Sequence, residues 1–226
     1  MGTPDIGNPE YFRPSSPDLT LDPKLFIMQI LAIFSLAALL SCATSTIAWL
    51  PPSPARNVYF LLDIASDHLG YFKLQQNIFE GLFNQLRNII SGTRVGVITF
   101  DENVQQLIKL DSNLKLADIT TTKVTVRNLG NVFIEINIRD LFSPSEGGLP
   151  NASNVIVVFI RGRISDNANA IAAANRLRAK PIRIIYVVIG TDVDLTLAGL
   201  ASSTDIVLAT DVVEVDGYVQ LVLNKL

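Results

Sequence analysis

The sequence of 226 residues has one cysteine and one histidine, two residue types that many enzymes and metalloproteins use at their sites. Its single cysteine, Cys42, excludes a disulfide within the chain, and this leaves the redox compartment open. Its single histidine, His68, has no cysteine near it, and no G-x-S-x-G nucleophile turn occurs anywhere. A lone histidine at the start of a helix is usually a surface or packing residue. We therefore predict that the protein is not an enzyme.

Nucleotides and nucleic acids lack a binding motif in this sequence. No G-x-G-x-x-G and no G-K-[ST] sequence occurs, so no glycine-rich loop is available to hold a phosphate group. The chain has 18 basic and 21 acidic side chains and a pI near 5.1, whereas nucleic-acid binding requires a basic surface. We predict no nucleotide, no nucleic-acid partner and no organic cofactor.

Charge is absent between Lys24 and Arg56, and residues 25–50 within this gap are mostly apolar. About 20 apolar residues are enough for a helix to cross a bilayer. This segment ends in Trp49, an interfacial residue, and prolines follow it directly. We predict a transmembrane helix over residues 25–50 that acts as an uncleaved signal anchor. The alternative is a signal peptide that is cleaved near Ala43 or Ala48, which would leave a secreted domain.

Residues 1–24 are rich in proline and poor in apolar groups, which predicts a flexible tail. Residues 51–56 form a proline-rich linker. Basic residues are nearly balanced on the two sides of the apolar segment, so they do not fix its orientation. The Asn-x-Ser sequence at Asn151 is a candidate glycosylation site and favours an extracellular C-terminal domain. We therefore expect a single-pass membrane protein whose folded domain lies outside the cell.

From residue 57 onward, short apolar runs alternate with segments of helical periodicity. This alternation predicts a Rossmann-like, doubly wound α/β fold, with a mostly parallel sheet and helices on both faces. Two residues separate 94–100 from 103–110, which predicts a hairpin and one antiparallel edge strand. The remaining strands are expected at 58–62, 154–160, 182–190 and 206–209, and the helices at 69–90, 132–142, 170–179, 195–201 and 216–226.

Several of these segments, in this order, resemble the von Willebrand factor A (vWA) domain family over residues 57–226. The matching segments are VYFLLD, VGVITFDENVQQLIKL, LGNVFIEINIRDLF, VIVVFIRGR, VVIGTDVDLTLAGLAS and VEVDGYVQLVLNKL. The resemblance implies a protein-interaction or adhesion domain, because members of this family typically bind a partner through a metal-ion-dependent adhesion site. That site consists of an Asp-x-Ser-x-Ser turn after the first strand, a Thr in a later loop and an Asp after the fourth strand.

The resemblance places the ligands of this adhesion site at Asp63, Ala65, Asp67, Asn131 and Arg161, of which the aspartate Asp63 alone matches the family pattern. Mg²⁺ requires six oxygen ligands at about 2.1 Å, and Ala65 has no side-chain oxygen. A guanidinium about 5 Å away would repel a divalent ion by on the order of 6 kcal/mol at an effective dielectric of 20. We therefore expect no metal, with Mg²⁺ or Mn²⁺ as the alternative, and hypothesise that Arg161 takes the place of the cation and pairs with Asp63.

These observations predict a membrane-anchored, metal-independent adhesion domain that binds a protein or extracellular-matrix ligand at the carboxyl end of the sheet. The candidate contact residues are Asp63, Ser66, Asp67, Asn131 and Arg161. Ser66 or Asp67 has an alternative role as the N-cap of the helix that follows. The alternative function is a structural or assembly module whose adhesion site is inactive and whose partner lies on a helix face or within the bilayer. One fold hosts many functions, so the argument from fold to adhesion is one of analogy.

Overall fold

The computed structural model describes residues 55–66, 69–89, 92–111, 119–190 and 205–226. Within these ranges no helix is both long and apolar enough to cross a membrane. The predicted tail at 1–24, the predicted membrane segment at 25–50 and most of the linker lie outside the described residues, as does the helix expected at 195–201.

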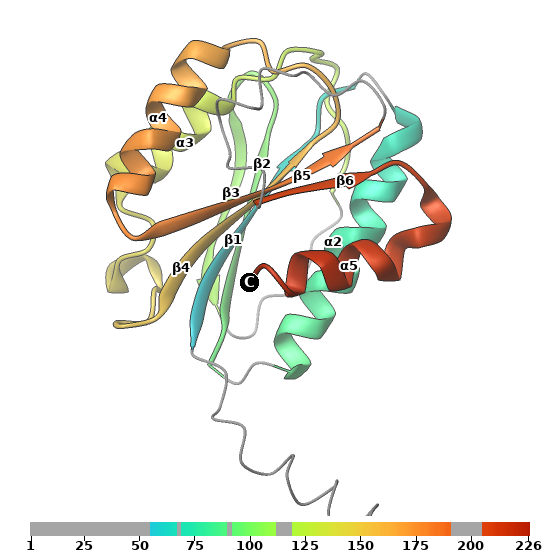
Figure 1. Ribbon diagram of the computed structural model, residues 1–226. Coiled ribbons are helices and arrows are strands. Elements are labelled where there is room, and N and C mark those ends of the chain that lie inside the picture. The colour runs from blue at the N-terminus through green and yellow to red at the C-terminus, as the bar shows by residue number, and fades with distance from the viewer. Residues whose placement is uncertain (1–54, 67–68, 90–91, 112–118, 191–204) are drawn as a thin grey trace, which may run out of the picture. The chain divides into compact units, whose positions relative to one another are not determined.

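Six strands form one sheet in the order β3-β2-β1-β4-β5-β6 (Figure 1). They are β1 (Arg56–Asp63), β2 (Arg94–Phe100), β3 (Val104–Asp111), β4 (Ser153–Ile160), β5 (Ile182–Ile189) and β6 (Ile206–Ala209). β3 is antiparallel to β2, and all other neighbours are parallel. The predicted mostly parallel sheet with one antiparallel edge strand is confirmed. The strand order reverses between β1 and β4, and a crevice is expected beyond the carboxyl ends of these two strands.

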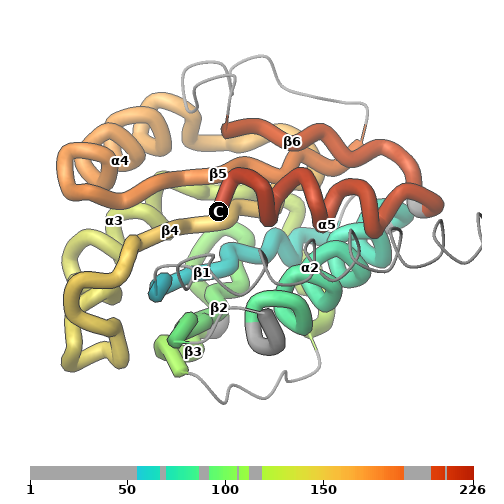
Figure 2. The backbone as a smooth tube through the Cα atoms, turned by 60° about the horizontal axis from the view of Figure 1, so that its bottom comes forward, coloured from blue at the N-terminus to red at the C-terminus, as the bar shows by residue number. Residues whose placement is uncertain are grey.

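Helices cover both faces of the sheet (Figure 2). α2 (Leu69–Ile89) and α5 (Val215–Leu223) pack together on one face, and α3 (Leu129–Arg139) and α4 (Asn167–Ala179) pack together on the other. Two short 3-10 turns, η2 (Pro144–Glu146) and η5 (Val212–Glu214), complete the described elements. The helices on both faces were predicted from the sequence, and the structure confirms them.

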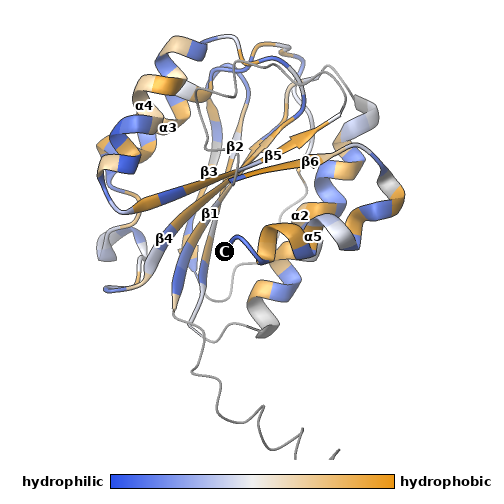
Figure 3. Cartoon of the chain, in the orientation of Figure 1, coloured by the Kyte–Doolittle hydropathy of each residue, from blue (hydrophilic) through white to orange (hydrophobic). Residues whose placement is uncertain are grey.

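The central strands are buried on both faces, which explains why they read as continuous apolar runs (Figure 3). Alternate side chains enter two separate cores. Tyr59 and Leu61 of β1 belong to the core between the sheet and the helices α3 and α4, whereas Phe60 and Leu62 belong to the core between the sheet and α2. The ring of Phe60 lies 5.1 Å from that of Phe79 on α2. The sheet therefore forms a rigid platform for the loops at its carboxyl end.

The structure corrects the predicted bounds of α3. The helix begins at Leu129 instead of residue 132, because Leu129 and Gly130 already pack into the core. It ends at Arg139, since Asp140 adopts a left-handed conformation (φ 48°) and its N–H bonds to the carbonyl of Ile136. Leu141 and Phe142 are buried, but they lie beyond the helix, so their apolar spacing was misleading.

Candidate functional site

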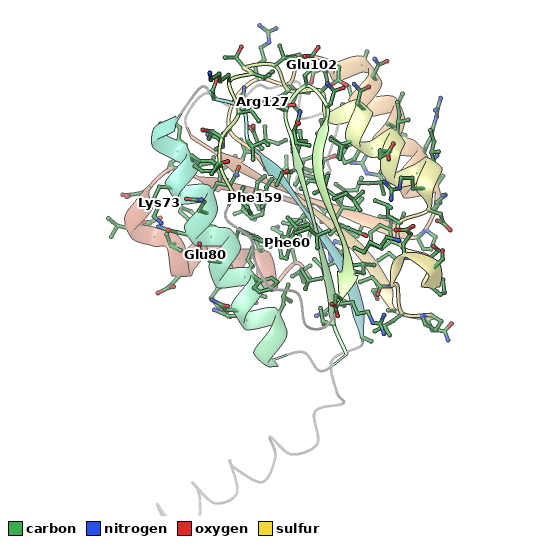
Figure 4. The ribbon with its side chains drawn as sticks, turned by 180° about the vertical axis from the view of Figure 1, so that it is seen from behind. Phe60, Lys73, Glu80, Glu102, Arg127 and Phe159 are labelled. Carbon is green, nitrogen blue, oxygen red and sulfur yellow. The ribbon has the colours of Figure 1, made fainter. Side chains whose placement is uncertain are left out.

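Three loops meet where the strand order reverses, and each supplies one buried ionic side chain. Asp63 ends β1, Arg161 follows β4 directly, and Arg127 lies in the segment that leads into α3. Their exposed fractions are 0%, 0% and 2%. Figure 4 shows Arg127 and Glu102 toward the loop end of the molecule, with Phe60 and Phe159 further from that end. Buried charges of this kind require partners, and these three residues provide them for one another.

The carboxylate of Asp63 accepts hydrogen bonds from three groups. Its Oδ1 accepts from the backbone N–H of Ala65 at 2.9 Å. Its Oδ2 accepts from Nε of Arg127 at 2.5 Å and from the backbone N–H of Arg161 at 3.0 Å. The carboxylate is thus fixed by a local turn and by two distant segments. Charge-assisted bonds of this type are stronger than neutral ones.

The guanidinium of Arg161 folds back over the turn that follows β1. Its Nη2 donates to the carbonyl oxygens of Asp63 at 3.0 Å and Ala65 at 2.7 Å. The same atom lies 3.6 Å from Oδ1 of Asp63, and the guanidinium sits 4.9 Å from the ring centroid of Phe72 on α2. The structure therefore brings Arg161 and Asp63 together as hypothesised, and the guanidinium also bonds to main-chain carbonyl oxygens.

Arg127 is the residue that the sequence analysis missed. It makes the shortest contact with the Asp63 carboxylate, and its main chain is fixed from the opposite side by Ser165. An arginine in a polar stretch before a helix is normally solvated, and nothing local marks this one as buried. The available clue is charge balance. If Arg161 bonds to carbonyl groups, another cation is needed to balance the buried carboxylate of Asp63.

The turn after β1 is also tied to the segment before α3. The N–H of Ser66 donates to the carbonyl of Val124 at 2.7 Å, and its hydroxyl reaches the same carbonyl at 3.2 Å. The N–H of Thr122 returns a bond to Ile64. Ser66 is thus engaged with Val124 of the segment before α3. Asp67, the other N-cap candidate, lies outside the described residues.

Asn131 does not lie where the resemblance placed it. Its side chain is exposed on the first turn of α3, and its amide nitrogen is 3.4 Å from the carbonyl oxygen of Glu102. Because α3 begins before Asn131, the loop position that faces Asp63 belongs to Arg127. The burial of Asp63 and Arg161 corrects a second expectation, since neither side chain can touch a partner in this structure. Asn151, the glycosylation candidate, is exposed in the turn before β4.

Two other carboxylates support the same loops. Asp101 is fully buried after β2, and its Oδ1 accepts bonds from the N–H of Asn103 at 3.0 Å and from Nε2 of Gln105 at 2.7 Å. Burial would raise the pKa of Asp101, but its hydrogen bonds outweigh this effect and hold the pKa below its ordinary value. Asp166 accepts a bond from the N–H of Gly130 at 2.9 Å, and burial raises its pKa.

The described residues of this site do not fit a divalent cation. Ala65 has no side-chain oxygen, the oxygens of Asp63 already accept bonds from Ala65, Arg127 and Arg161, and two guanidinium groups add positive charge. In the described part of the chain, no three histidine, cysteine, aspartate or glutamate side chains cluster in a way that could hold a metal ion. The arrangement of the described residues is suited to holding loops together.

Comparison with known proteins identifies a family for the sequence and similar structures for the fold. The sequence model of the von Willebrand factor type A domain matches residues 57–221. Among solved structures, proximal thread matrix protein 1 from the mussel byssus is similar to this chain, with a TM-score of 0.64, 18% identity and coverage of 75% of this chain. A form of that protein has zinc in its MIDAS motif. The VWA domain of SpRpn10 is also similar, with a TM-score of 0.53, 19% identity and coverage of 69% of this chain and 87% of that domain.

These structural similarities concern the fold alone, because all of the identities lie below 25%. The match spans 47% of the mussel matrix protein, so about half of that protein has no counterpart in the aligned region. A comparison with curated protein sequences gives no match.

Proposed function

Because this chain belongs to the von Willebrand factor type A domain family, we propose that it is a protein-interaction module, which binds a protein or extracellular-matrix partner and has no catalytic activity. The observation that carries the proposal is the family match over residues 57–221. It is combined with the arrangement of the loops at the carboxyl end of the sheet, here called the rim, which are held together by the contacts of Asp63 with Arg127 and Arg161. A rim that is already fixed loses little conformational entropy when it binds a partner.

The contact surface that we propose consists of exposed groups around the buried network. Glu102, in the turn after β2, and Asn131, on the first turn of α3, are exposed and are linked by the contact between the Asn131 amide and the Glu102 carbonyl. Ser66 is half-buried in the turn after β1, where it bonds to Val124, and remains a candidate at the edge of the rim. Asp63 and Arg161 act as supports beneath this surface. We propose that binding needs no divalent cation, because the residues below the rim do not fit one.

The remaining parts of the proposal concern the setting of the domain. We propose that residues 25–50 anchor the chain in a membrane and that the folded domain is extracellular. The apolar segment 25–50 and the exposed sequon at Asn151 support this placement. A secreted domain after cleavage of the apolar segment is the alternative, and it leaves the binding surface unchanged.

A second function is favoured by a specific feature of the helix pair α3–α4. A shallow hollow between these helices is lined by Phe133, Ile134, Asn137, Ile138, Ala173 and Arg176. The side chain of Ile138 is 73% exposed there. An apolar side chain at the edge of a hollow is a natural contact for another protein. This feature supports the assembly module, in which the partner binds a helix face and the loop rim is inactive.

Site-specific photocrosslinking of the full chain separates the two functions. A photoreactive amino acid is placed at Asn131 on the rim, at Ile138 beside the hollow, or at Leu221 on α5, which is 50% exposed and serves as the control. We expect the variant at position 131 to crosslink one defined partner, with equal yield in the presence of a chelator. Crosslinks at position 138 alone would support the assembly module and contradict binding at the rim.

A further inference from the structure

We propose that the guanidinium of Arg127 is a built-in cation, which occupies the position of the divalent ion in this type of site and makes the crevice permanently independent of metal. The inference concerns the same site as the proposed function. Its test requires no partner, so that either proposal can fail without the other.

The first argument is the contact itself. Nε of Arg127 lies 2.5 Å from Oδ2 of Asp63, and both side chains are almost completely buried. A buried carboxylate is stable only when a positive charge or several donors compensate for its lost hydration. Arg127 supplies that charge directly at the oxygen, through a charge-assisted hydrogen bond.

The second argument is the connection that Arg127 makes in the chain. A cation at the carboxyl end of β1 would join the β1 turn to the loops before α3 and after β4. Arg127 makes the same connection. It is itself part of the segment before α3, and its side chain bonds to Asp63 at the start of the β1 turn. Its N–H donates to Oγ of Ser165, and its carbonyl accepts from the N–H of Ser165 in the loop after β4. One side chain and its own main chain therefore link all three loops.

The third argument is a division of roles between the two arginines. Nη2 of Arg161 is 3.6 Å from the Asp63 carboxylate but only 2.7 Å from the carbonyl oxygen of Ala65. Arg161 thus stabilises the main chain of the turn and packs on Phe72, whereas Arg127 neutralises the carboxylate. This assignment replaces the hypothesis that Arg161 stands in for the cation.

The chemical consequence is a site without an exchangeable ion. A guanidinium remains protonated at every physiological pH, and a side chain cannot diffuse away or be removed by a chelator. The loops should therefore keep one arrangement whether divalent ions are present or absent.

Chemical rescue tests the proposal. In the full chain, Arg127→Ala leaves the Asp63 carboxylate without its nearest cation, and Tm should fall by on the order of 10 °C. Millimolar guanidinium chloride should then raise the Tm of Arg127→Ala, because the free ion fits the vacated position. The same guanidinium concentration should leave wild type and Arg139→Ala unchanged or slightly destabilised. Arg139 is a suitable control because its ion pair with Glu135 is exposed.

The result that overturns the proposal is equally specific. Recovery of stability in Arg127→Ala with either guanidinium or Mn²⁺ supports the proposal, whereas a loss of stability that neither ion restores would show that Arg127 is not a substitute for the cation. If Arg127→Ala does not fold, the wild-type chain decides the question by itself. An unchanged Tm in Mn²⁺ and in EDTA supports the proposal, and a Tm that rises with Mn²⁺ or falls with EDTA overturns it.

Discussion

Asp63 is the residue on which the loop end of this domain depends. Its carboxylate accepts hydrogen bonds from the turn that it starts, from the segment before α3 and from the residue after β4. Its carbonyl oxygen accepts further bonds from Gln75 and Arg161. A buried ion pair is a weak source of stability relative to an apolar core, but removal of one partner is costly because the other charge remains buried.

The substitution Asp63→Asn should therefore destabilise the fold by about 3–5 kcal/mol, since it removes the buried carboxylate that pairs with both guanidinium groups. Chemical denaturation of the full chain measures this change in the free energy of unfolding. Asp205→Asn is the matched control, because Asp205 pairs with the half-exposed Arg183 and should cost less than about 1 kcal/mol. Equal effects of the two substitutions would contradict the central role of Asp63.

Asp101 should make the stability of the domain depend on pH. Its pKa is lowered in the folded state, so its contribution is present above the ordinary value of 3.8 and is lost as the pH falls through the folded-state pKa. The raised pKa of Asp166 acts in the opposite direction, since its charged form is the costly one. The clean measurement is thus the difference in unfolding free energy between wild type and Asp101→Asn, which should shrink as the pH falls. A difference that does not vary with pH would refute this expectation.

At the scale of elements, buried parallel strands are the features that the sequence predicts best. The strand predicted at 94–100 has the same bounds as β2. The strands β1 and β4 are longer than predicted by one or two residues at their ends. The helix α3 was shifted by three residues, because its start depends on contacts with α4. Arg127 could not be predicted as a buried side chain, since its partner Asp63 lies 64 positions earlier. Local sequence patterns predict the fold, whereas the ion pair of Asp63 and Arg127 forms only when the tertiary structure brings the two residues together.

Gly130 shows how closely α3 approaches α4. A Cβ atom there would lie 2.5 Å from Oδ2 of Asp166 and 2.8 Å from the backbone nitrogen of Ala170. Gly130→Ala should therefore destabilise the fold by roughly 1–3 kcal/mol, despite the better helix propensity of alanine. Gly217→Ala in α5 is the control, because its Cβ would meet nothing within 4 Å and should stabilise the helix by about 0.5–1 kcal/mol. Thermal denaturation of both variants checks the sign of each effect.

At the scale of the whole molecule, the placement of the domain relative to the membrane can be read from a glycan. Asn151 is exposed and has a positive φ of 64°, a conformation that asparagine tolerates better than most residues. If the domain is extracellular, the full chain expressed in a secretory system should carry an N-glycan at Asn151. Ser153→Ala removes the sequon without straining residue 151, and Ser153→Thr preserves it. A protein that is unmodified and accessible to protease from the cytosolic side would reverse the proposed orientation.

Direct titration of the purified full chain with Mg²⁺ and Mn²⁺ tests whether a built-in cation replaces the metal. Isothermal calorimetry should detect no binding to wild type, because Arg127 already neutralises Asp63 and Ala65 offers no ligand. Asp63→Asn identifies any heat that arises elsewhere in the chain. Micromolar binding of either ion that disappears in Asp63→Asn would contradict the replacement of the metal by Arg127.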